Sequence, residues 1–260
     1  MSLLVFFLIE ASQGSQYYQR ANELFKQQQF SQAAESIDLA IRKEPRFMPA
    51  WTLRGKIAMA FDRFDYARAA FERAVALAPN SAYAQFMLGF CFYVDNDFSN
   101  AIVPLESARR LDPNDPRSLL YLAMSQEGLA HLELAEPLYQ KTIELEAKLG
   151  RPSPETHTAY ARLLLTLNRN EESALQIAQV LRLDPNSRDG NYESGRLAFA
   201  SGDFATAAVL GEKALTELGS GTLDRQIHFL LTRSYSKLGN TQLAQLHRKA
   251  FEASPPTLRR

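Results

Sequence analysis

The sequence predicts an all-α protein, a right-handed α-solenoid in which antiparallel helix pairs stack side by side into a superhelix. Prolines recur at a fixed interval, since Pro45, Pro79 and Pro113 follow one another 34 residues apart. Small side chains recur in phase with them, Gly55 and Ala67 being one such pair. Proline cannot continue a helix, and small side chains let two helices approach closely. A repeated helix–turn–helix unit, too small to bury its own apolar stripe, accounts for both periodicities by stacking on its neighbours.

Residues 48–81 form the clearest unit. Trp51, Gly55, Ala67, Phe71, Ala74 and Pro79 stand at its positions 4, 8, 20, 24, 27 and 32. This spacing resembles the tetratricopeptide repeat. We expect Gly55 to let the first helix lie close against the second, where Ala67 is the answering small residue. Trp51 and Phe71 are expected to fill the space on either side of that contact, and Pro79 to end the second helix.

The same motif positions recur along almost the whole chain, so we predict a single array over residues 15–258. The predicted repeats are 14–47, 48–81, 82–115, 116–149, 154–187, 188–221 and 225–258. The flanking units keep the motif, with Tyr17, Ala21, Leu24, Ala33, Ile37 and Ala40 in the first and Leu88, Gly89, Phe92, Ala101, Leu105 and Ala108 in the third.

Repeats 4, 6 and 7 depart furthest from the motif. Repeat 4 has Ala147 where the closing proline is expected, and residues 150–153 lengthen the turn that follows. Repeat 6 has Gly211 where a large residue is usual. We expect no polar capping helix after repeat 7, which is predicted to run from Arg225 to Leu258. We expect the last helix to cover its outer face with the polar side chains His247, Arg248 and Lys249, or to dimerise.

Residues 1–14 differ from the array. Leu3 to Ile9 is a run of seven apolar residues, followed by small residues. As a helix it would be only about 10 Å long, so no transmembrane span is predicted. It resembles the end of a secretory signal peptide, with a cut expected after Gly14. We therefore expect an exported protein, periplasmic or secreted. The alternative is a cytoplasmic protein whose apolar strip folds onto the first repeat.

Composition excludes several classes of function. The 29 basic and 29 acidic residues balance, which argues against a nucleic-acid-binding protein. The single cysteine, Cys91, excludes an internal disulfide framework and a thiolate metal cage, and the four histidines show no ligand spacing. No phosphate-binding loop, metalloprotease motif or nucleophile elbow is present. We therefore predict no cofactor, no metal and no catalytic residue, so that the chain is not an enzyme.

The resemblance implies that the first helices line an inner groove, mainly through positions 2, 5, 9 and 12 of each repeat. Position 9 of repeats 5, 6 and 7 is an arginine: Arg162, Arg196 and Arg233. The groove positions also gather large apolar side chains: Tyr83, Phe86, Phe90, Tyr93, Leu120, Met124, Tyr192, Phe199 and Phe229. Arginines beside aromatics suit an extended or helical peptide that carries carboxylates and apolar anchors. The alternative is that the aromatics pack between repeats and the arginines pair with neighbouring acids.

One known subtype of the family is excluded. Its carboxylate clamp binds acidic chaperone tails through a lysine and asparagines at fixed groove positions. Asn22 fits that pattern, but Tyr18, Leu53, Tyr83 and Met87 replace the other residues that the clamp needs. We therefore do not expect this chain to bind an acidic chaperone tail.

The predicted function is a non-catalytic protein–protein interaction module, a scaffold, adaptor or assembly factor that binds a peptide or partner segment in its concave groove. Two alternatives stay open. One is an accessory subunit that presents substrate to a separate enzyme. The other is a structural protein that forms homo-oligomers through its terminal helices.

Overall fold

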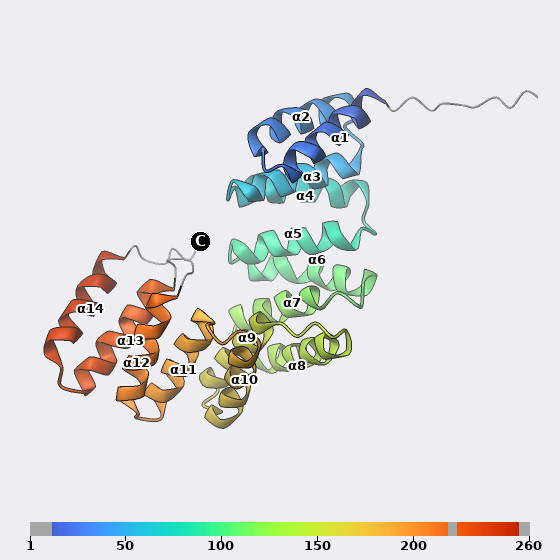
Figure 1. Ribbon diagram of the computed structural model, residues 1–260. Helices are drawn as coiled ribbons and strands as arrows, with labels where there is room; N and C mark the ends of the chain where they lie inside the picture. The colour runs from blue at the N-terminus through green and yellow to red at the C-terminus, as the bar shows by residue number, and fades with distance from the viewer. Residues whose placement is uncertain (1–11, 218–222, 255–260) are drawn as a thin grey trace, which may run out of the picture. The chain divides into compact units, whose positions relative to one another are not determined.

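The computed structural model describes residues 12–217 and 223–254, and this part of the chain contains fourteen α-helices and no strand (Figure 1). The described residues form two compact units, which divide between Ser118 and Leu119. The N-terminal unit contains α1 (Gln13–Lys26), α2 (Phe30–Lys43), α3 (Met48–Ala60), α4 (Phe64–Leu77), α5 (Ala82–Val94), α6 (Phe98–Leu111) and the start of α7 (Pro116–Gly128). The C-terminal unit continues with the rest of α7, α8 (Leu132–Lys148), α9 (Pro154–Thr166), α10 (Asn170–Leu183), α11 (Arg188–Ala200), α12 (Phe204–Thr216), α13 (Asp224–Lys237) and α14 (Thr241–Ala253).

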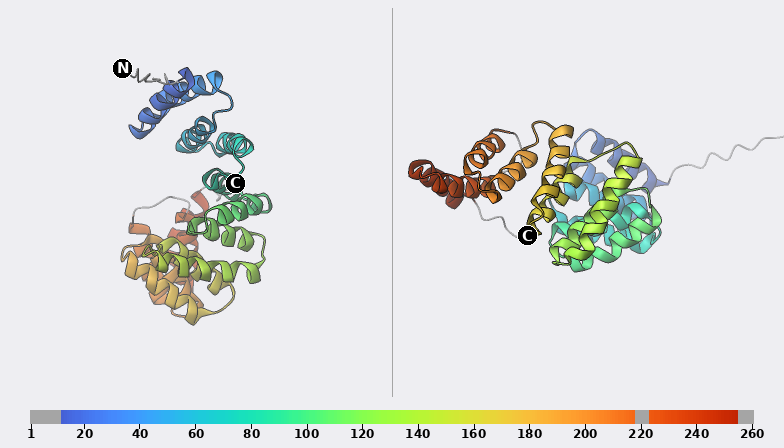
Figure 2. Two further views of the ribbon diagram at one scale, coloured as in Figure 1. Left: turned by 90° about the vertical axis from the view of Figure 1, so that its right-hand side faces the viewer. Right: turned by 90° about the horizontal axis from the view of Figure 1, so that it is seen from below.

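Within each unit, successive helices run antiparallel and pack as consecutive pairs, as Figure 1 and Figure 2 show. The predicted all-α class, built from stacked helix pairs, is confirmed. The apolar run of residues 3–9 and Pro256 lie outside the described residues. Gly14 lies inside α1, where Ser12 Oγ caps the helix by accepting a hydrogen bond from Ser15 N at 3.2 Å.

Small residues lie in the seams between paired helices, as the motif predicts. Gly55 faces the ring of Phe71 so closely that a Cβ atom there would lie 2.6 Å from Cζ. Phe71 and Ala67 are fully buried. Trp51, in contrast, is only half-buried, and its indole Nε1 donates a hydrogen bond to the Pro45 carbonyl at 2.8 Å across the preceding turn. Phe71 therefore fills the seam as expected, whereas Trp51 is hydrogen-bonded to the turn between the first two repeats.

Every first helix of a pair is followed by one residue in the left-handed backbone region, which turns the chain back towards the second helix. These residues are Gln28, Asp62, Asn96, Ala130, Asn168, Gly202 and Gly239. Their φ angles lie between +55° and +82°. This conformation suits glycine and asparagine and is strained for a residue such as alanine. The regular position of this turn sets the antiparallel pairing of all seven helix pairs in the described chain.

Glu146 closes the irregular turn after α8. With alanine in place of the motif proline, α8 extends to 17 residues, compared with 14 in α10. The buried Glu146 carboxylate accepts hydrogen bonds from Thr156 Oγ1 at 2.6 Å and from Ser153 N at 3.1 Å. Burial raises the pKa of Glu146, although both hydrogen bonds act in the opposite direction. The Glu146 carboxylate therefore links the end of α8 to Ser153 of the insertion and to Thr156 in the first turn of α9.

The end of the C-terminal unit corrects one sequence expectation. His247 does not belong to the exposed outer face with Arg248 and Lys249, because it is only 6% exposed. Its Nε2 lies 2.9 Å from Glu212 Oε1, and its Nδ1 lies 3.1 Å from Nδ1 of His228. Two of the four histidines, His228 and His247, thus meet where α12, α13 and α14 pack together.

Candidate functional site

The C-terminal unit contains a hollow of about 770 Å³ that is lined by first helices of its pairs. We call it the arginine hollow. Its lining residues come from α7, α9, α11 and α13: Glu127, Arg162, Thr166, Tyr192, Glu193, Arg196, Phe199, Ala200, Gln226, Phe229, Leu230 and Arg233. Because first helices follow one another every second element, their equivalent positions fall side by side and build one surface from four repeats.

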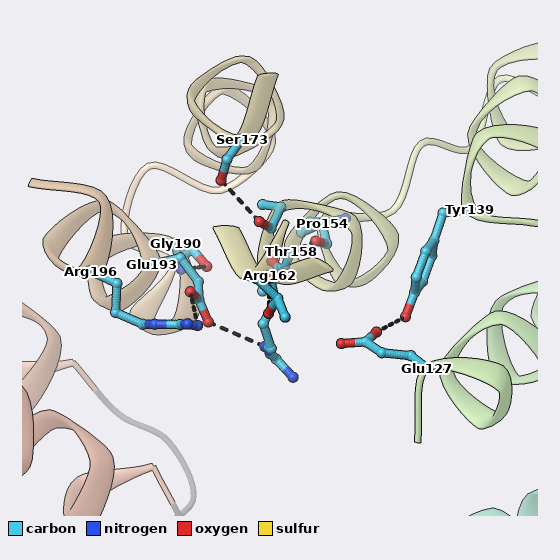
Figure 3. Close-up of polar contacts among 12 residues, drawn as sticks. Glu127, Tyr139, Pro154, Thr158, Arg162, Ser173, Gly190, Glu193 and Arg196 are labelled. Carbon is cyan, nitrogen blue, oxygen red and sulfur yellow. Dashed lines mark hydrogen bonds and ion pairs between the residues drawn. The ribbon is translucent and has the colours of Figure 1, made fainter. Parts of the chain in front are cut away.

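Glu193 of α11 organises the wall of this hollow (Figure 3). Its side chain is 2% exposed, and its carboxylate contacts Arg196 Nη1 at 2.7 Å and Arg162 Nε at 3.3 Å. Arg196 is three residues further along α11, a spacing that places both side chains on one helix face. Arg162 reaches the same carboxylate from α9. One buried acid therefore holds two of the three predicted groove arginines in place and offsets part of their charge.

The pKa values of Arg162 and Glu127 at this wall are raised, each by a different cause. Burial of Arg162 disfavours its charged form, but Glu193 outweighs that effect, so the pKa of Arg162 is raised. Burial raises the pKa of Glu127, although a hydrogen bond of 2.6 Å from Tyr139 Oη and the charge of Arg162 lower it. Figure 3 shows Glu127 held by Tyr139 on the far side of Arg162.

Arg233 differs from the other two arginines. It is exposed, and its guanidinium carbon lies 4.3 Å from the ring centre of Phe199 and 5.6 Å from that of Phe229. Among the described residues it forms no ion pair. A guanidinium stacked on aromatic rings keeps its N–H groups directed outward, where they can donate two parallel hydrogen bonds to a carboxylate. Arg233 is therefore the arginine of the hollow with an uncompensated charge.

Six of the twelve predicted groove residues line the arginine hollow: Arg162, Tyr192, Arg196, Phe199, Phe229 and Arg233. Leu120 is instead buried in an apolar cluster of the C-terminal unit. Met124 lines a neighbouring hollow of about 370 Å³, which also includes Arg162. The predicted aromatics of α5 belong to the N-terminal unit. That these aromatics bind a partner segment stays a prediction, separate from the arginine hollow.

In the N-terminal unit, Tyr83 lines a hollow of about 250 Å³ together with Tyr18, Asn22 and Leu53, and the ammonium of Lys56 lies 4.7 Å from its ring centre. Phe86 is buried, and the guanidinium carbon of Arg117 lies 4.7 Å from its ring centre. Tyr93 packs against Phe98, with ring centres 5.8 Å apart, and Phe90 packs against Phe86, with ring centres 6.2 Å apart. Both ring pairs lie within repeat 3, so they are not the packing between repeats that the alternative describes.

Two acids of the hollow were absent from the predicted set. Glu127 occupies position 12 of repeat 4, one of the groove positions, so the same rule points to it. Glu193 occupies position 6 of repeat 6, which lies outside that rule. The signal that was available for Glu193 is its spacing of three residues from Arg196, which favours an ion pair on a helix.

The described residues contain no group of three His, Cys, Asp or Glu side chains placed to hold a metal ion. Cys91 is fully buried, and burial raises the pKa of its thiol to about 12. A thiol with this pKa is protonated near neutral pH and is a poor nucleophile. None of the described helices combines the length and the apolar composition needed to span a bilayer.

Comparison with known proteins identifies the repeated unit. The tetratricopeptide repeat family matches residues 18–82, 52–116 and 158–221, which together make up more than half of the chain. The chain belongs to the tetratricopeptide repeat family. The resemblance drawn from motif spacing is therefore confirmed, and the fourteen described helices fit about seven repeats.

Two relatives of the chain are named as subunits. It is 25% identical over 257 residues to mitochondrial import receptor subunit TOM70 of Homo sapiens, covering 94% of this chain and 39% of that protein. It is 22% identical over 177 residues to anaphase-promoting complex subunit 3 of Schizosaccharomyces pombe, covering 68% of this chain and 26% of that protein. The chain thus spans well under half the length of both relatives.

A third relative matches over most of its own length. The chain is 22% identical over 226 residues to outer membrane protein assembly factor BamD of Neisseria meningitidis, covering 83% of this chain and 84% of that protein. Among solved structures, a tetratricopeptide repeat protein from Parabacteroides merdae is similar with a TM-score of 0.76 at 17% identity, covering 94% of each chain. The structural likeness supports the fold of stacked helix pairs.

Proposed function

We propose that this chain is a non-catalytic protein-binding module that holds a segment of a partner protein in the arginine hollow, acting as a scaffold, adaptor or assembly factor. The observation that carries the proposal is the pairing of an uncompensated arginine, Arg233, with the exposed ring of Phe229 in a hollow built from four repeats. Charged and aromatic anchors of this kind dominate the binding free energy of protein interfaces.

The internal contacts of the hollow support binding rather than catalysis. Glu193 holds Arg162 and Arg196 in fixed positions, so that the wall is organised before a partner arrives. Preorganisation of this kind lowers the entropic cost of binding. The relatives that are named as an import receptor subunit, a complex subunit and an assembly factor all fit a chain that works by contacting other proteins.

Crosslinking and pull-down from the source cells tests the proposal. The variant Arg233→Glu, combined with Phe229→Ala, reverses the uncompensated charge and removes the exposed ring while leaving the buried Glu193 pairs intact. Its control is Arg182→Glu, which makes the same charge change on exposed α10, outside the hollow. We expect wild type and control to capture the same partners and the double variant to lose them. Identical partners with all three baits would contradict the proposal.

We also propose that the protein is exported, on the basis of the apolar run of residues 3–9 and the similarity to an outer membrane protein assembly factor. N-terminal sequencing of the natural protein tests this. A mature chain that begins near residue 15 is the expected result, and a chain that begins at Met1 would contradict cleavage.

A further inference from the structure

The outward face of α13 carries a regular pattern at one edge of the arginine hollow. Arg225, Phe229 and Arg233 follow one another at intervals of four residues, so they share one helix face. We propose, on the basis of the function proposed above, that the bound segment is extended and carries two carboxylates on either side of one apolar side chain, which α13 recognises through these three residues.

Arg225 resembles Arg233 in lacking an acidic partner. Its guanidinium carbon lies 4.4 Å from the ring centre of Phe251, and its Nε atom is buried without a hydrogen-bond partner. Among the described residues it forms no ion pair, and residues 218–222 and 255–260 contain no aspartate or glutamate. Because Nε is closed to solvent, a carboxylate from another chain would pair with this guanidinium through its terminal Nη groups, as arginine–carboxylate pairs commonly do.

Other arginines of the same unit do have acidic partners. Arg162 and Arg196 contact Glu193, Arg169 contacts Glu136 at 2.6 Å, and Arg188 contacts Asp224. Arg151 and Arg182 also form no ion pair among the described residues, but they are exposed and line none of the hollows described here. Arg225 and Arg233 differ from them because both lie on the face of α13 that borders a hollow.

Phe229 lies between the two arginines and is 48% exposed. It lines both the arginine hollow and a second hollow of about 240 Å³, which is formed with Tyr192, Arg225, Gln226 and Phe251. Its ring centre lies 5.6 Å from that of Phe251. An aliphatic or aromatic side chain placed here would contact apolar rings on two helices, which gives the segment its apolar anchor.

The spacing along α13 matches an extended segment. Eight residues of helix rise about 12 Å, which separates Arg225 from Arg233. In an extended chain, side chains at k, k+2 and k+4 point the same way, and k and k+4 lie about 13 Å apart. An Asp or Glu at k and k+4, with an apolar residue at k+2, would therefore reach all three side chains at once.

Backbone hydrogen bonding at the site favours an extended chain over a helix. Tyr192 of α11 and Leu230 of α13 belong to one apolar cluster, so these helices pack together beneath the site. A helix uses its backbone N–H and C=O groups internally, whereas an extended chain leaves them free to bond with the protein. The exposed amide of Gln226 can hydrogen-bond the backbone of such a strand.

Fluorescence anisotropy with labelled synthetic peptides tests the proposal on the full chain. The matching probe contains Ser-Glu-Ser-Leu-Ser-Glu-Ser, and its control has the same composition rearranged as Ser-Glu-Glu-Ser-Leu-Ser-Ser. We expect the matching probe to bind about 10-fold more tightly, with an affinity that falls as salt is added. We expect Arg225→Gln and Arg233→Gln each to weaken it about 5- to 10-fold. Arg182→Gln, with the same loss of charge, is expected to have no effect.

A double-mutant cycle assigns each contact. Replacing one glutamate of the probe with glutamine weakens binding. This loss of affinity should be smaller for the arginine variant that lacks the partner of that glutamate than for the wild-type protein. Equal binding of both probes, or tighter binding of a helical probe with its anchors four residues apart, would overturn the extended pattern. The proposed function fails as well if two further results are obtained. One is that the Phe229→Ala variant binds every probe as wild type does. The other is that the double variant Arg233→Glu with Phe229→Ala retains its cellular partners. Failure of the matching probe to bind overturns this inference, whatever the pull-down shows.

Discussion

Gly55→Ala tests the seam between α3 and α4 most sharply. The added Cβ atom would lie 2.6, 2.7 and 2.9 Å from three ring carbons of Phe71. Because the Phe71 ring is fully buried, it cannot swing into solvent to make room. Overpacking of this kind costs about 1–3 kcal/mol. Alanine gains up to about 1 kcal/mol over glycine within a helix. We therefore expect the free energy of unfolding of the N-terminal unit to fall by about 1–2 kcal/mol.

Urea unfolding followed by fluorescence measures this change. Trp51 is the only tryptophan and lies one turn from Gly55 in α3, so its emission reports on the N-terminal unit. The control is a double-mutant cycle with Phe71→Leu, which removes the ring that the methyl group would strike. Gly55→Ala should cost less in the Phe71→Leu background than in the wild type. An increase in stability on Gly55→Ala alone would refute the seam as described.

Three further predictions concern other parts of the fold. Gly202 has a φ of +82° with open space around its Cα, so Gly202→Ala should lower the free energy of unfolding by about 1 kcal/mol. Ala130 has a φ of +61°, so Ala130→Gly should raise the free energy of unfolding. Urea unfolding measures both changes. Burial and the neighbouring His247 lower the pKa of His228, while Glu212 acts in the opposite direction. A lowered histidine pKa stabilises the neutral form in the fold, so the C-terminal unit should lose stability as pH falls below about 6.5, and His228→Gln should reduce that loss in urea unfolding at two pH values. Because the pKa of the Cys91 thiol is raised to about 12, a disulfide reagent at pH 8 should label it far more slowly in the native chain than in urea, and equal rates would contradict its burial.

The sequence predicts the fold well because its signals are local and periodic. Gly55 and Phe71 fall at fixed positions of one repeat, and their contact depends only on the pairing of adjacent helices. The left-handed residue after each first helix escaped prediction because glycine occupies it only at Gly202 and Gly239. At Ala130 the residue type gives no hint of the conformation, which is imposed by the packing of the helices on either side.

The candidate site was harder to predict because it depends on contacts between repeats. Position 9 predicts Arg162, Arg196 and Arg233 as one set, but Glu193 divides them: it pairs with the first two and leaves the third uncompensated. The alternative of arginines paired with neighbouring acids thus describes two of the three. His247 was misplaced for a similar reason, since its partners come from α12 and α13 and no spacing within α14 reveals them.

Site-specific photo-crosslinking in the source cells tests the central claim most directly. A photoreactive phenylalanine analogue would replace Phe229 in the arginine hollow or, as a matched control, Leu175 on α10, which is 66% exposed and outside the hollow. We predict a discrete crosslinked partner from position 229 and none from position 175. The same partner from both positions, or a partner from position 175 alone, would contradict binding in the hollow.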